Sequence, residues 1–511
     1  MKRLVIDGTK LDIDTVSRVA LDPSLNVTLA SRARKNCQKN RRVVERLLRK
    51  GTPLYGINTG FGDLARVSIP PSDLVSLQVN LIRSHAVGVG NPLEPEVVRA
   101  ALLLRANTLA RGVSGVRPEL IDALLALLNA NVIPVIPEKG SLGASGDLAP
   151  LAHMSLVLMG EGEAFYEGRR ISGALALKKV KLSPIGLEAK EGLALINGTP
   201  IMSAIACLAL VRARTLLKAA STVAAMSIEA LRGTDAAFDA RIHKLRGHPG
   251  QIEIARHLRA SLENSSIRAS HRECLKVQDA YSLRCTPQVL GASMDAWLHT
   301  KNVIEREINA VTDNPLVFED GVFSGGNFHG EPVGLVMDYL SCAMAEVGSI
   351  SERRCFRLLT SALSDLPPFL VKTSGVNSGL MIAQYTAASL VSENKVLSHP
   401  ATVDSIPSSA DQEDHVSMAT TASRKTWAVM DNLDNILAIE YLCASQALDL
   451  LRPLKPSPAA AAARKLLRKY VATIDDDRWF GPDIEKAREL IASGRVDQVS
   501  AKACNYEWEL L

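Results

Sequence analysis

Residues 140–150 combine small residues with two serines and an aspartate, which makes them the part of the chain most suited to unusual chemistry. The amide nitrogen of Gly146 can bend back onto the carbonyl carbon of Ala144, because glycine adopts backbone conformations barred to other residues. If this ring closes, and if water is lost at the ring and at Ser145, the product is an electrophilic methylidene-imidazolone. A plain loop before a helix, with Ser145 or Asp147 as the N-cap, would explain the same residues without chemistry.

Six further polar segments interrupt the apolar helical pattern of the chain. They are residues 55–62, 84–85, 197–199, 278–284, 324–330 and 412–415. Polar side chains are costly to bury without partners, so convergence of all seven segments on one cavity would explain them together. Such a cavity would contain phenols, amides, a guanidinium and carboxylates, which suits an amino-acid substrate.

Several side chains in these segments have candidate roles. A guanidinium can hold a carboxylate with two hydrogen bonds, which is the role expected for Arg284. Tyr281 or Tyr55 can move a proton, and His85 and Glu413 can form hydrogen bonds with a polar side chain. The structural alternatives are an ion pair between Arg284 and Glu413, a histidine at a helix cap, and a tyrosine packed with its hydroxyl on a backbone carbonyl.

Helices are expected to position these segments. Aromatic residues make up only 4% of the chain, and an apolar content dominated by leucine, alanine, valine and isoleucine favours helix. Helices are predicted at residues 201–233, 243–265, 288–309, 333–361, 378–397 and 421–451, with a small hairpin within 161–187. We therefore predict a mainly α fold built on a long-helix bundle. A soft division separates a smaller, mostly helical N-terminal part, residues 1–200, from the central bundle and C-terminal helices in 201–511.

Composition and motif patterns argue against several classes of function. The net charge of +5, from 59 basic and 54 acidic residues, is too small to indicate nucleic-acid binding. The eight cysteines form no Cys-x-x-Cys pair, which predicts reduced core thiols in a cytoplasmic protein and no metal site. The sequence contains no phosphate-binding Gly-x-x-x-x-Gly-Lys-Ser/Thr, no His-Glu-x-x-His and no Gly-x-Ser-x-Gly around Ser145. Three basic residues interrupt the apolar segment 201–231, so we expect a buried helix there and no membrane association.

The polar segments match the motifs of a known family. The chain resembles the aromatic amino acid ammonia-lyases over nearly its whole length. The matching motifs are Gly-Ser-Leu-Gly-Ala-Ser-Gly-Asp-Leu-Ala-Pro-Leu-Ala at 140–152, Tyr-Gly-Ile-Asn-Thr-Gly-Phe-Gly at 55–62, Asn-Gly-Thr at 197–199, Gln-Asp-Ala-Tyr-Ser-Leu-Arg at 278–284, Asp-Asn-Pro at 313–315 and Gly-Gly-Asn-Phe-His-Gly at 325–330. Together these motifs are very specific.

Two segments distinguish substrates within this family. The first segment is Ser84-His85, and the second is Gln-Glu-Asp-His-Val-Ser-Met at 412–418; both are similar to the histidine-selective members, the histidine ammonia-lyases. At the first segment, tyrosine- and phenylalanine-selective members instead resemble His-Leu or Phe-Leu. At the second segment, phenylalanine enzymes are nearer Asn-Gln-Asp. An imidazole can pair with His85 and Glu413, whereas a phenyl ring would leave them unpaired at about 1–3 kcal/mol each. Asp411 departs from the residues usual in these enzymes and would add a negative charge near Glu413.

The resemblance implies an activity and a cofactor. Ala144, Ser145 and Gly146 are expected to cyclise autocatalytically into 4-methylidene-imidazol-5-one (MIO), the only cofactor, with no metal and no external group. The implied reaction is the elimination of ammonia from L-histidine to give trans-urocanate, the first step of histidine degradation, by a carbon–nitrogen lyase. The implied fold is that of the ammonia-lyase/fumarase-like superfamily, in a homotetramer whose active sites are shared between subunits.

The resemblance also assigns roles to the site residues. Tyr281 is the expected base, Tyr55 assists, and Arg284 clamps the substrate carboxylate. The other expected substrate-binding residues are His85, Asn197, Gln278, Phe328, Gln412 and Glu413. The alternatives are a tyrosine or phenylalanine ammonia-lyase, an MIO-dependent 2,3-aminomutase, which the motifs hardly separate from a lyase, and a non-catalytic helical scaffold.

Overall fold

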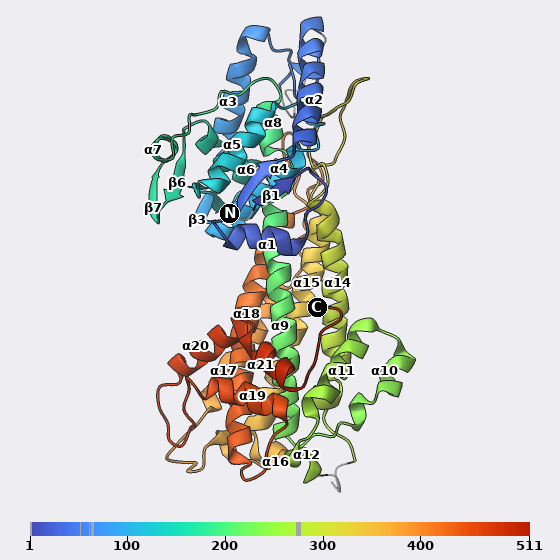
Figure 1. The fold of residues 1–511 in the computed structure, drawn as a ribbon, viewed down its shortest axis with the longest axis vertical. Helices are drawn as coiled ribbons and strands as arrows, with labels where there is room; N and C mark the ends of the chain where they lie inside the picture. The colour runs from blue at the N-terminus through green and yellow to red at the C-terminus, as the bar shows by residue number, and fades with distance from the viewer. Residues whose placement is uncertain (1–2, 52, 61, 63–65, 272–276) are drawn as a thin grey trace. The chain divides into compact units, whose positions relative to one another are not determined.

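The computed structural model of the chain describes residues 3–51, 53–60, 62, 66–271 and 277–511 (Figure 1). The chain forms two compact units. Unit 1 consists of Met1–Val211, Lys301–Asp338 and Pro400–Arg424, and unit 2 consists of Arg212–Thr300, Tyr339–His399 and Lys425–Leu511. The predicted domain boundary at residue 200 stays a prediction; the chain first leaves unit 1 after Val211 and later returns to it twice.

Unit 1 is built from short helices and small sheets. Its helices are α1 (Ile13–Leu21), α2 (Ser31–Lys50), α3 (Leu74–His85), α4 (Pro95–Leu109), α5 (Pro118–Asn129), α6 (Leu148–Leu158), α7 (Gly173–Lys179) and α8 (Glu191–Ile196), with a 3-10 turn η2 at Pro71–Asp73. Strand β1 (Arg3–Ile6) pairs in parallel with β2 (Asn26–Leu29). The other sheets are antiparallel: β3 (Val89–Pro92) pairs with β5 (Pro137–Lys139), and β8 (Leu316–Val317) pairs with β9 (Val322–Phe323). In the three-stranded sheet, β6 (Glu163–Tyr166) lies between β4 (Ile133–Pro134) and β7 (Arg169–Ser172) and pairs with both. The β6–β7 pair confirms the predicted hairpin.

Helix α4 runs through the core of unit 1. Pro95 begins the helix, where its missing N–H is not needed. Every residue from Val97 to Leu109 is buried, and the helix packs against α1 and α5. Two of these buried residues are arginines, Arg99 at 3% and Arg105 at 0% exposure. A guanidinium is costly to bury, so each of these two side chains needs hydrogen-bond acceptors inside the core.

The longest helices run into unit 2. Four of the five boundaries between the units fall within α9 (Pro200–Ala230), α14 (Thr286–Glu307), α15 (Glu331–Leu359) and α18 (Ala419–Leu450), and the fifth lies between His399 and Pro400. The helices that lie wholly in unit 2 are α10 (Ala240–Arg246), α11 (Pro249–Leu262), α12 (Ser266–Ala269), α13 (Tyr281–Arg284), α16 (Ser361–Ser364), α17 (Met381–Leu397), α19 (Pro458–Leu467), α20 (Gly481–Ala492) and α21 (Arg495–Ala503), with 3-10 turns η3 (Ala236–Phe238) and η4 (Pro368–Leu370).

A buried carboxylate ties three of these helices together inside unit 2. Glu440 of α18 accepts hydrogen bonds from Arg354 and Ser351 of α15 and from Ser227 of α9. Glu440 and Arg354 are both 0% exposed. Removing one partner of such a pair costs about 3–5 kcal/mol because the other charge stays buried and unpaired. The cluster therefore fixes how α9, α15 and α18 pack against one another.

The mainly α fold is confirmed, and the predicted long helices correspond to α9, α14, α15, α17 and α18. The predicted helix over 243–265 is instead two helices, because Gly247 ends α10 with a left-handed φ of 80° and Pro249 begins α11. Helices α9 and α15 are long and apolar enough to cross a membrane, a property they share with core helices of soluble proteins. In their most apolar windows 78% and 61% of the residues, respectively, are buried.

Candidate active site

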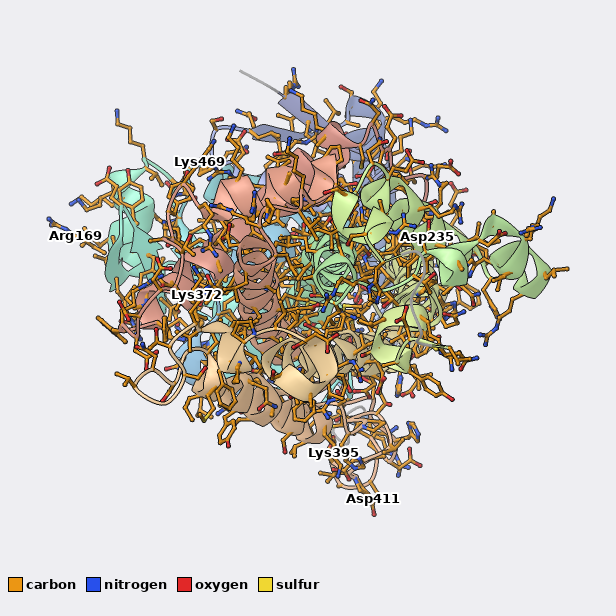
Figure 2. The ribbon with its side chains drawn as sticks, turned by 90° about the horizontal axis from the view of Figure 1, so that it is seen from below. Arg169, Asp235, Lys372, Lys395, Asp411 and Lys469 are labelled. Carbon is orange, nitrogen blue, oxygen red and sulfur yellow. The ribbon has the colours of Figure 1, made fainter. Side chains whose placement is uncertain are left out.

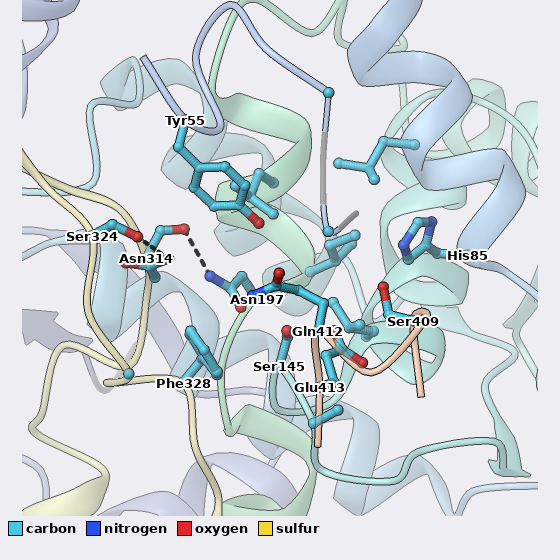
Figure 3. Close-up of a pocket in the computed structure, with 18 of the residues that line it drawn as sticks. Tyr55, His85, Ser145, Asn197, Asn314, Ser324, Phe328, Ser409, Gln412 and Glu413 are labelled. Atoms are coloured by element: carbon cyan, nitrogen blue, oxygen red, sulfur yellow. Dashed lines mark hydrogen bonds between the residues drawn. The ribbon is translucent and has the colours of Figure 1, made fainter. Parts of the chain in front are cut away.

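A pocket of about 970 Å³ lies in unit 1 (Figure 3). Eight of the predicted site residues line it: Tyr55, His85, Ala144, Ser145, Asn197, Phe328, Gln412 and Glu413. Gly146 lines a second pocket of about 210 Å³, which shares His85, Ala144 and Glu413 with the first. These eight residues come from six of the seven polar segments, so the structure brings six of the segments together at one pocket.

The glycine-rich loop, residues 140–150, approaches a second backbone very closely. Gly146 has a φ of +76°, and a Cβ on it would lie 2.0 Å from the carbonyl oxygen of Gly198. The Gly198 N–H donates to the Ser145 carbonyl oxygen at 3.1 Å, and the Asp147 N–H donates to the Gly198 carbonyl oxygen at 2.7 Å. Any side chain at Gly146 would break this pairing, so the loop conformation depends on glycine there.

Asp147 anchors the glycine-rich loop to the start of α9. Its Oδ2 accepts hydrogen bonds from the N–H groups of Ile201 and Met202 at 2.9 and 3.0 Å, and its Oδ1 accepts from Thr420 Oγ1 at 2.6 Å. Complete burial raises the pKa of the carboxyl to about 6, while these hydrogen bonds act in the opposite direction. Asp147 occupies the N-cap position of α6, as the structural alternative had it, but its side chain makes no capping bond there and accepts from the first turn of α9 instead.

The hydroxyl group of Ser145 meets the loop that carries Glu413. Ser145 Oγ donates to Glu413 Oε1 at 3.2 Å, and Ser408 Oγ donates to Glu413 Oε2 at 2.8 Å. The backbones of Ser408 and Glu413 pair across a tight turn. Three residues inside that turn have positive φ angles, namely Ser409, Ala410 and Asp411. Because residues other than glycine adopt this conformation at a cost, the contacts of Glu413 must hold the turn in place.

Asp411 points away from the pocket. Its side chain is exposed and lines neither pocket, and Figure 2 shows it at the outer end of its loop. The next residues, Gln412 and Glu413, both line the larger pocket. Asp411 is therefore not part of the pocket lining, and the expectation that its charge acts near Glu413 stays a prediction.

Tyr55 and His85 enter the pocket from different walls (Figure 3). Burial raises the pKa of the Tyr55 phenol, against the effect of a hydrogen bond with the Gly62 backbone. Burial lowers the pKa of His85 below its ordinary 6.5, against the attraction of Glu413. The Nδ1 atom of His85 lies 3.0 Å from Ser84 Oγ. Both rings are therefore uncharged at neutral pH, as a neutral phenol and a neutral imidazole.

Asn197 ends α8 and lies in the middle of the pocket (Figure 3). Its Nδ2 donates to the Asn314 carbonyl oxygen at 2.8 Å and lies 3.4 Å from Asp313 Oδ1. Its Oδ1 is buried and has no hydrogen-bond partner among the described residues. A buried acceptor without a donor costs about 1–3 kcal/mol. This acceptor therefore has an unused hydrogen-bonding capacity next to the pocket.

Charged residues behind Asn197 were not predicted from the sequence as part of the site. Arg105 Nη1 donates to the Asn197 carbonyl oxygen at 2.6 Å, and Lys190 Nζ lies 2.9 Å from Asp313 Oδ2. All three charged side chains are buried. Asp313 belongs to one of the matched motifs, but the two cations belong to none. Their only signal in the sequence was a charge inside an otherwise apolar run, as in Leu-Leu-Leu-Arg-Ala at 102–106.

His329, Glu331 and His415 form a cluster of metal-ligand types, with one candidate ligand atom of each within 4.8 Å of the others. The ring of His329 is already engaged, however. Its Nδ1 accepts from the Glu331 N–H at 3.3 Å, and its Nε2 lies 3.3 Å from the His415 carbonyl oxygen. A metal would have to displace these contacts, so the cluster is explained without one.

Three predicted site residues belong to unit 2 and line neither described pocket: Gln278, Tyr281 and Arg284. The Tyr281 side chain is 71% exposed at the start of α13. The Arg284 guanidinium lies over its ring, 4.4 Å from the centroid, and Nε donates to the Asp279 carbonyl oxygen at 3.0 Å. The predicted roles of these residues stay predictions.

Comparison with known proteins agrees with this pattern of residues. The family model "aromatic amino acid lyase" matches residues 11–469. A histidine ammonia-lyase of Caldanaerobacter subterraneus subsp. tengcongensis is 52% identical over 501 residues, covering 98% of each chain. The crystal structure of histidine ammonia-lyase from Trypanosoma cruzi superposes with a TM-score of 0.92 at 42% identity, covering 99% of this chain and 96% of the other.

A tyrosine aminomutase from Streptomyces globisporus is also similar, with a TM-score of 0.94 at 37% identity, covering 99% of this chain and all of the other. The likeness thus extends to enzymes that differ in substrate and in outcome. What they share is the family and its chemistry at a carbon–nitrogen bond. On these matches, the chain belongs to the aromatic amino acid lyase family and is a carbon–nitrogen lyase.

Proposed function

We propose that this protein eliminates ammonia from L-histidine to give trans-urocanate, the first step of histidine degradation. The observation that carries the proposal is one shared pocket, in which His85 and Glu413 lie together with Ala144 and Ser145. The names of the most similar curated relatives support the same substrate. A site with these polar groups discriminates against a phenyl ring, because the ring would leave them without partners.

We also propose that Ala144, Ser145 and Gly146 cyclise autocatalytically into MIO, the prosthetic group typical of this family, and that no external cofactor is needed. Two features of the described residues fit the group. The left-handed backbone at Gly146 folds the loop tightly, and the unpaired Oδ1 of Asn197 offers an acceptor in the same pocket. When present, the group supplies an electrophile that makes the substrate amine a better leaving group.

The pocket residues bind and orient the substrate. His85 and Glu413 form hydrogen bonds with the imidazole ring, and Gln412 completes this shell. Asn197 Oδ1 accepts a hydrogen bond from the substrate amine. Phe328 packs beside the prosthetic group and helps to exclude water.

The residues of unit 2 supply the remaining groups from a neighbouring subunit of a homotetramer. Tyr281 removes the β-proton of the substrate with help from Tyr55, Arg284 holds the carboxylate, and Gln278 completes the hydrogen bonds. The exposure of Tyr281 supports a site that another chain completes. Exposed apolar side chains of α15 and α17 support assembly as well, namely Tyr339 at 50%, Ile382 at 59%, Tyr385 at 60% and Val396 at 73% exposure.

A cytoplasmic location is part of the proposal. All cysteines that the structure describes are free, and four of them are buried. Unpaired thiols persist in a reducing compartment, which supports this location.

An absorbance scan after addition of L-histidine tests the function. We expect the spectrum of urocanate to grow with L-histidine and far more slowly with L-tyrosine or L-phenylalanine, the control substrates. Analysis of the products separates the alternative of a 2,3-aminomutase, which would return the amine to the β-carbon. If protein that shows the ring absorbance forms no urocanate from L-histidine, the proposed substrate is contradicted.

A further inference from the structure

Arg105 is a buried cation with an unusually small set of partners. Its side chain is 0% exposed, and Nη1 donates to the Asn197 carbonyl oxygen at 2.6 Å. Its Nε and Nη2 atoms are buried and have no hydrogen-bond partner among the described residues. Burial lowers the pKa of the guanidinium to about 10, so the group stays charged at neutral pH. The attraction of the buried Asp313 carboxylate offsets part of the cost of burial, but two donor atoms of Arg105 have lost water without replacement, so stability alone explains this arginine poorly.

The carbonyl group that Arg105 binds belongs to the peptide between Asn197 and Gly198. The N–H of that same peptide donates to the Ser145 carbonyl oxygen at 3.1 Å. The guanidinium, the peptide and the Ser145 carbonyl therefore form one chain of hydrogen bonds. Hydrogen bonds in such a chain polarise one another, so a cation at one end makes the N–H at the other end a stronger donor.

The peptide is also held from its other sides. The side chain of Asn197 is fixed by the Asn314 carbonyl group and by Asp313, which itself is paired with Lys190. A Cβ on Gly198 would lie 2.1 Å from the Thr312 carbonyl oxygen and 2.9 Å from Arg105 Nη1. The peptide thus has little freedom to turn its N–H away from Ser145.

The Ser145 carbonyl oxygen is where negative charge develops when this serine is dehydrated. Ser145 loses its Cα proton and its Oγ as hydroxide, which together make one water, and a double bond forms between Cα and Cβ. As the Cα proton leaves, the electron pair delocalises onto the adjacent carbonyl oxygen. In the ring closure, the nitrogen of Gly146 bonds to the carbonyl carbon of Ala144, whose oxygen leaves with one proton from each of the nitrogens of Ser145 and Gly146 as a second water.

We propose that Arg105 is a positioning residue for the maturation of the prosthetic group, acting through the Asn197–Gly198 peptide to strengthen hydrogen bonding to the Ser145 carbonyl oxygen. The inference rests on the proposed function, since it presupposes that Ser145 is dehydrated. Preorganised donors aimed at developing negative charge are among the largest contributions to catalysis. Here the guanidinium acts through the peptide on such a donor, the Gly198 N–H, and it contacts neither the substrate nor the reacting atoms.

Arg99 provides a matched comparison within the same helix. It lies on α4 and is 3% exposed, and like Arg105 it donates to backbone carbonyl groups. Its acceptors are in the core away from the pocket, among them the carbonyl oxygens of Val19, Ala20 and Leu128. Replacing Arg99 removes a buried cation without touching the chain of hydrogen bonds that reaches Ser145.

The experiment follows maturation of the full chain by intact mass and by the ultraviolet absorbance of the ring. Wild-type protein and the variants R105M, R105K and R99M are purified after short expression and incubated, while the loss of two water masses is timed. We expect R105M to lose them more slowly by on the order of tenfold, less than the effect of deleting an oxyanion donor outright. R105K recovers part of the rate because it keeps the charge, and R99M matures as fast as the wild type although its melting temperature falls.

Two results would overturn the inference directly: folded R105M matures at the wild-type rate, or R99M and R105M are slowed equally. If R105M fails to fold, R105K is compared with a matching R99K, and equal maturation rates of these two variants would overturn the inference. The proposed function is judged separately in the same data. If the wild-type chain keeps both waters, the prosthetic group itself is wrong; if it loses them regardless of Arg105, only the role of Arg105 is wrong.

Discussion

The two compact units hold their site residues in opposite ways. In unit 1, Ser145 and Asn197 are held by hydrogen bonds to several segments of the chain, and the charged groups behind Asn197 are buried. In unit 2, Tyr281 is 71% exposed and contacts Arg284 of its own short helix. The difference separates two physical requirements. The proposed cyclisation needs a rigid backbone around the peptide, whereas a residue proposed to complete the site of another chain must be exposed in its own.

Buried polar atoms without a hydrogen-bond partner occur in both units among the described residues, and three of them lie at Asn197 and Arg105 in unit 1. Asn197 Oδ1 and two nitrogens of Arg105 are buried without partners in unit 1. Such atoms reduce stability, and proteins retain them where function benefits.

The most damaging change to the unit 1 site is Ser145→Ala. We expect loss of the ring absorbance and a fall in histidine turnover by about four orders of magnitude or more, the scale of losing a covalent catalyst. Intact mass and a urocanate assay measure both. Ser155→Ala is the control, because the hydroxyl group of the buried Ser155 donates to the Leu151 carbonyl oxygen within α6 and Ser155 lines neither pocket. If the Ser145→Ala protein were active, turnover would not depend on a group formed from Ser145, and the proposed reason for the rigid unit 1 site would be lost.

The exposed half of the site is tested by Tyr281→Phe. We expect turnover to fall by roughly 10²–10⁴-fold, as for loss of a general base, while the ring absorbance persists. The sharper test mixes subunits: coexpression of Tyr281→Phe with Ser145→Ala should restore part of the activity, because some sites then combine an intact Ser145 with an intact Tyr281 from the neighbour. Coexpression without any recovery, in assemblies verified to contain both chains, would indicate that each chain builds its own site.

The sequence allowed the helical fold and much of the pocket to be predicted, because both depend on local patterns. The long helices follow from apolar periodicity, and the pocket loops from polar residues that break it. Arg105 escaped prediction because its importance lies in which carbonyl group it meets across 92 positions of sequence. The turn at Ser409, Ala410 and Asp411 escaped prediction as well, because none of these three residues is a glycine and yet all have positive φ angles.

Substrate choice within unit 1 is tested by Glu413→Gln against Asp411→Asn. We expect Glu413→Gln to lower kcat/KM for histidine by about 10- to 100-fold, the cost of weakening one charge-assisted hydrogen bond. Asp411→Asn removes the same charge two residues away, from a side chain that points to solvent (Figure 2), and should change kcat/KM little. Steady-state kinetics decide between them, and equal losses in both variants would mean that loop charge matters more than direct contact.

The smallest effect concerns the protonation of His85. Burial holds its pKa in the folded protein below the ordinary 6.5, so as the pH falls the unfolded chain takes up a proton at this residue before the folded one does. Stability therefore decreases as the pH drops through this window, and the His85 contribution is fully present only above it. Replacing it by glutamine should make the melting temperature less sensitive to pH as the pH falls below about 6.5. Since the half-buried ring faces the pocket, the affinity of the His85→Gln variant for the substrate should fall at the same time. If the pH dependence of melting were unchanged, the ring would titrate as it does in water. This wall of the pocket would then not share the burial that distinguishes the rest of the unit 1 site.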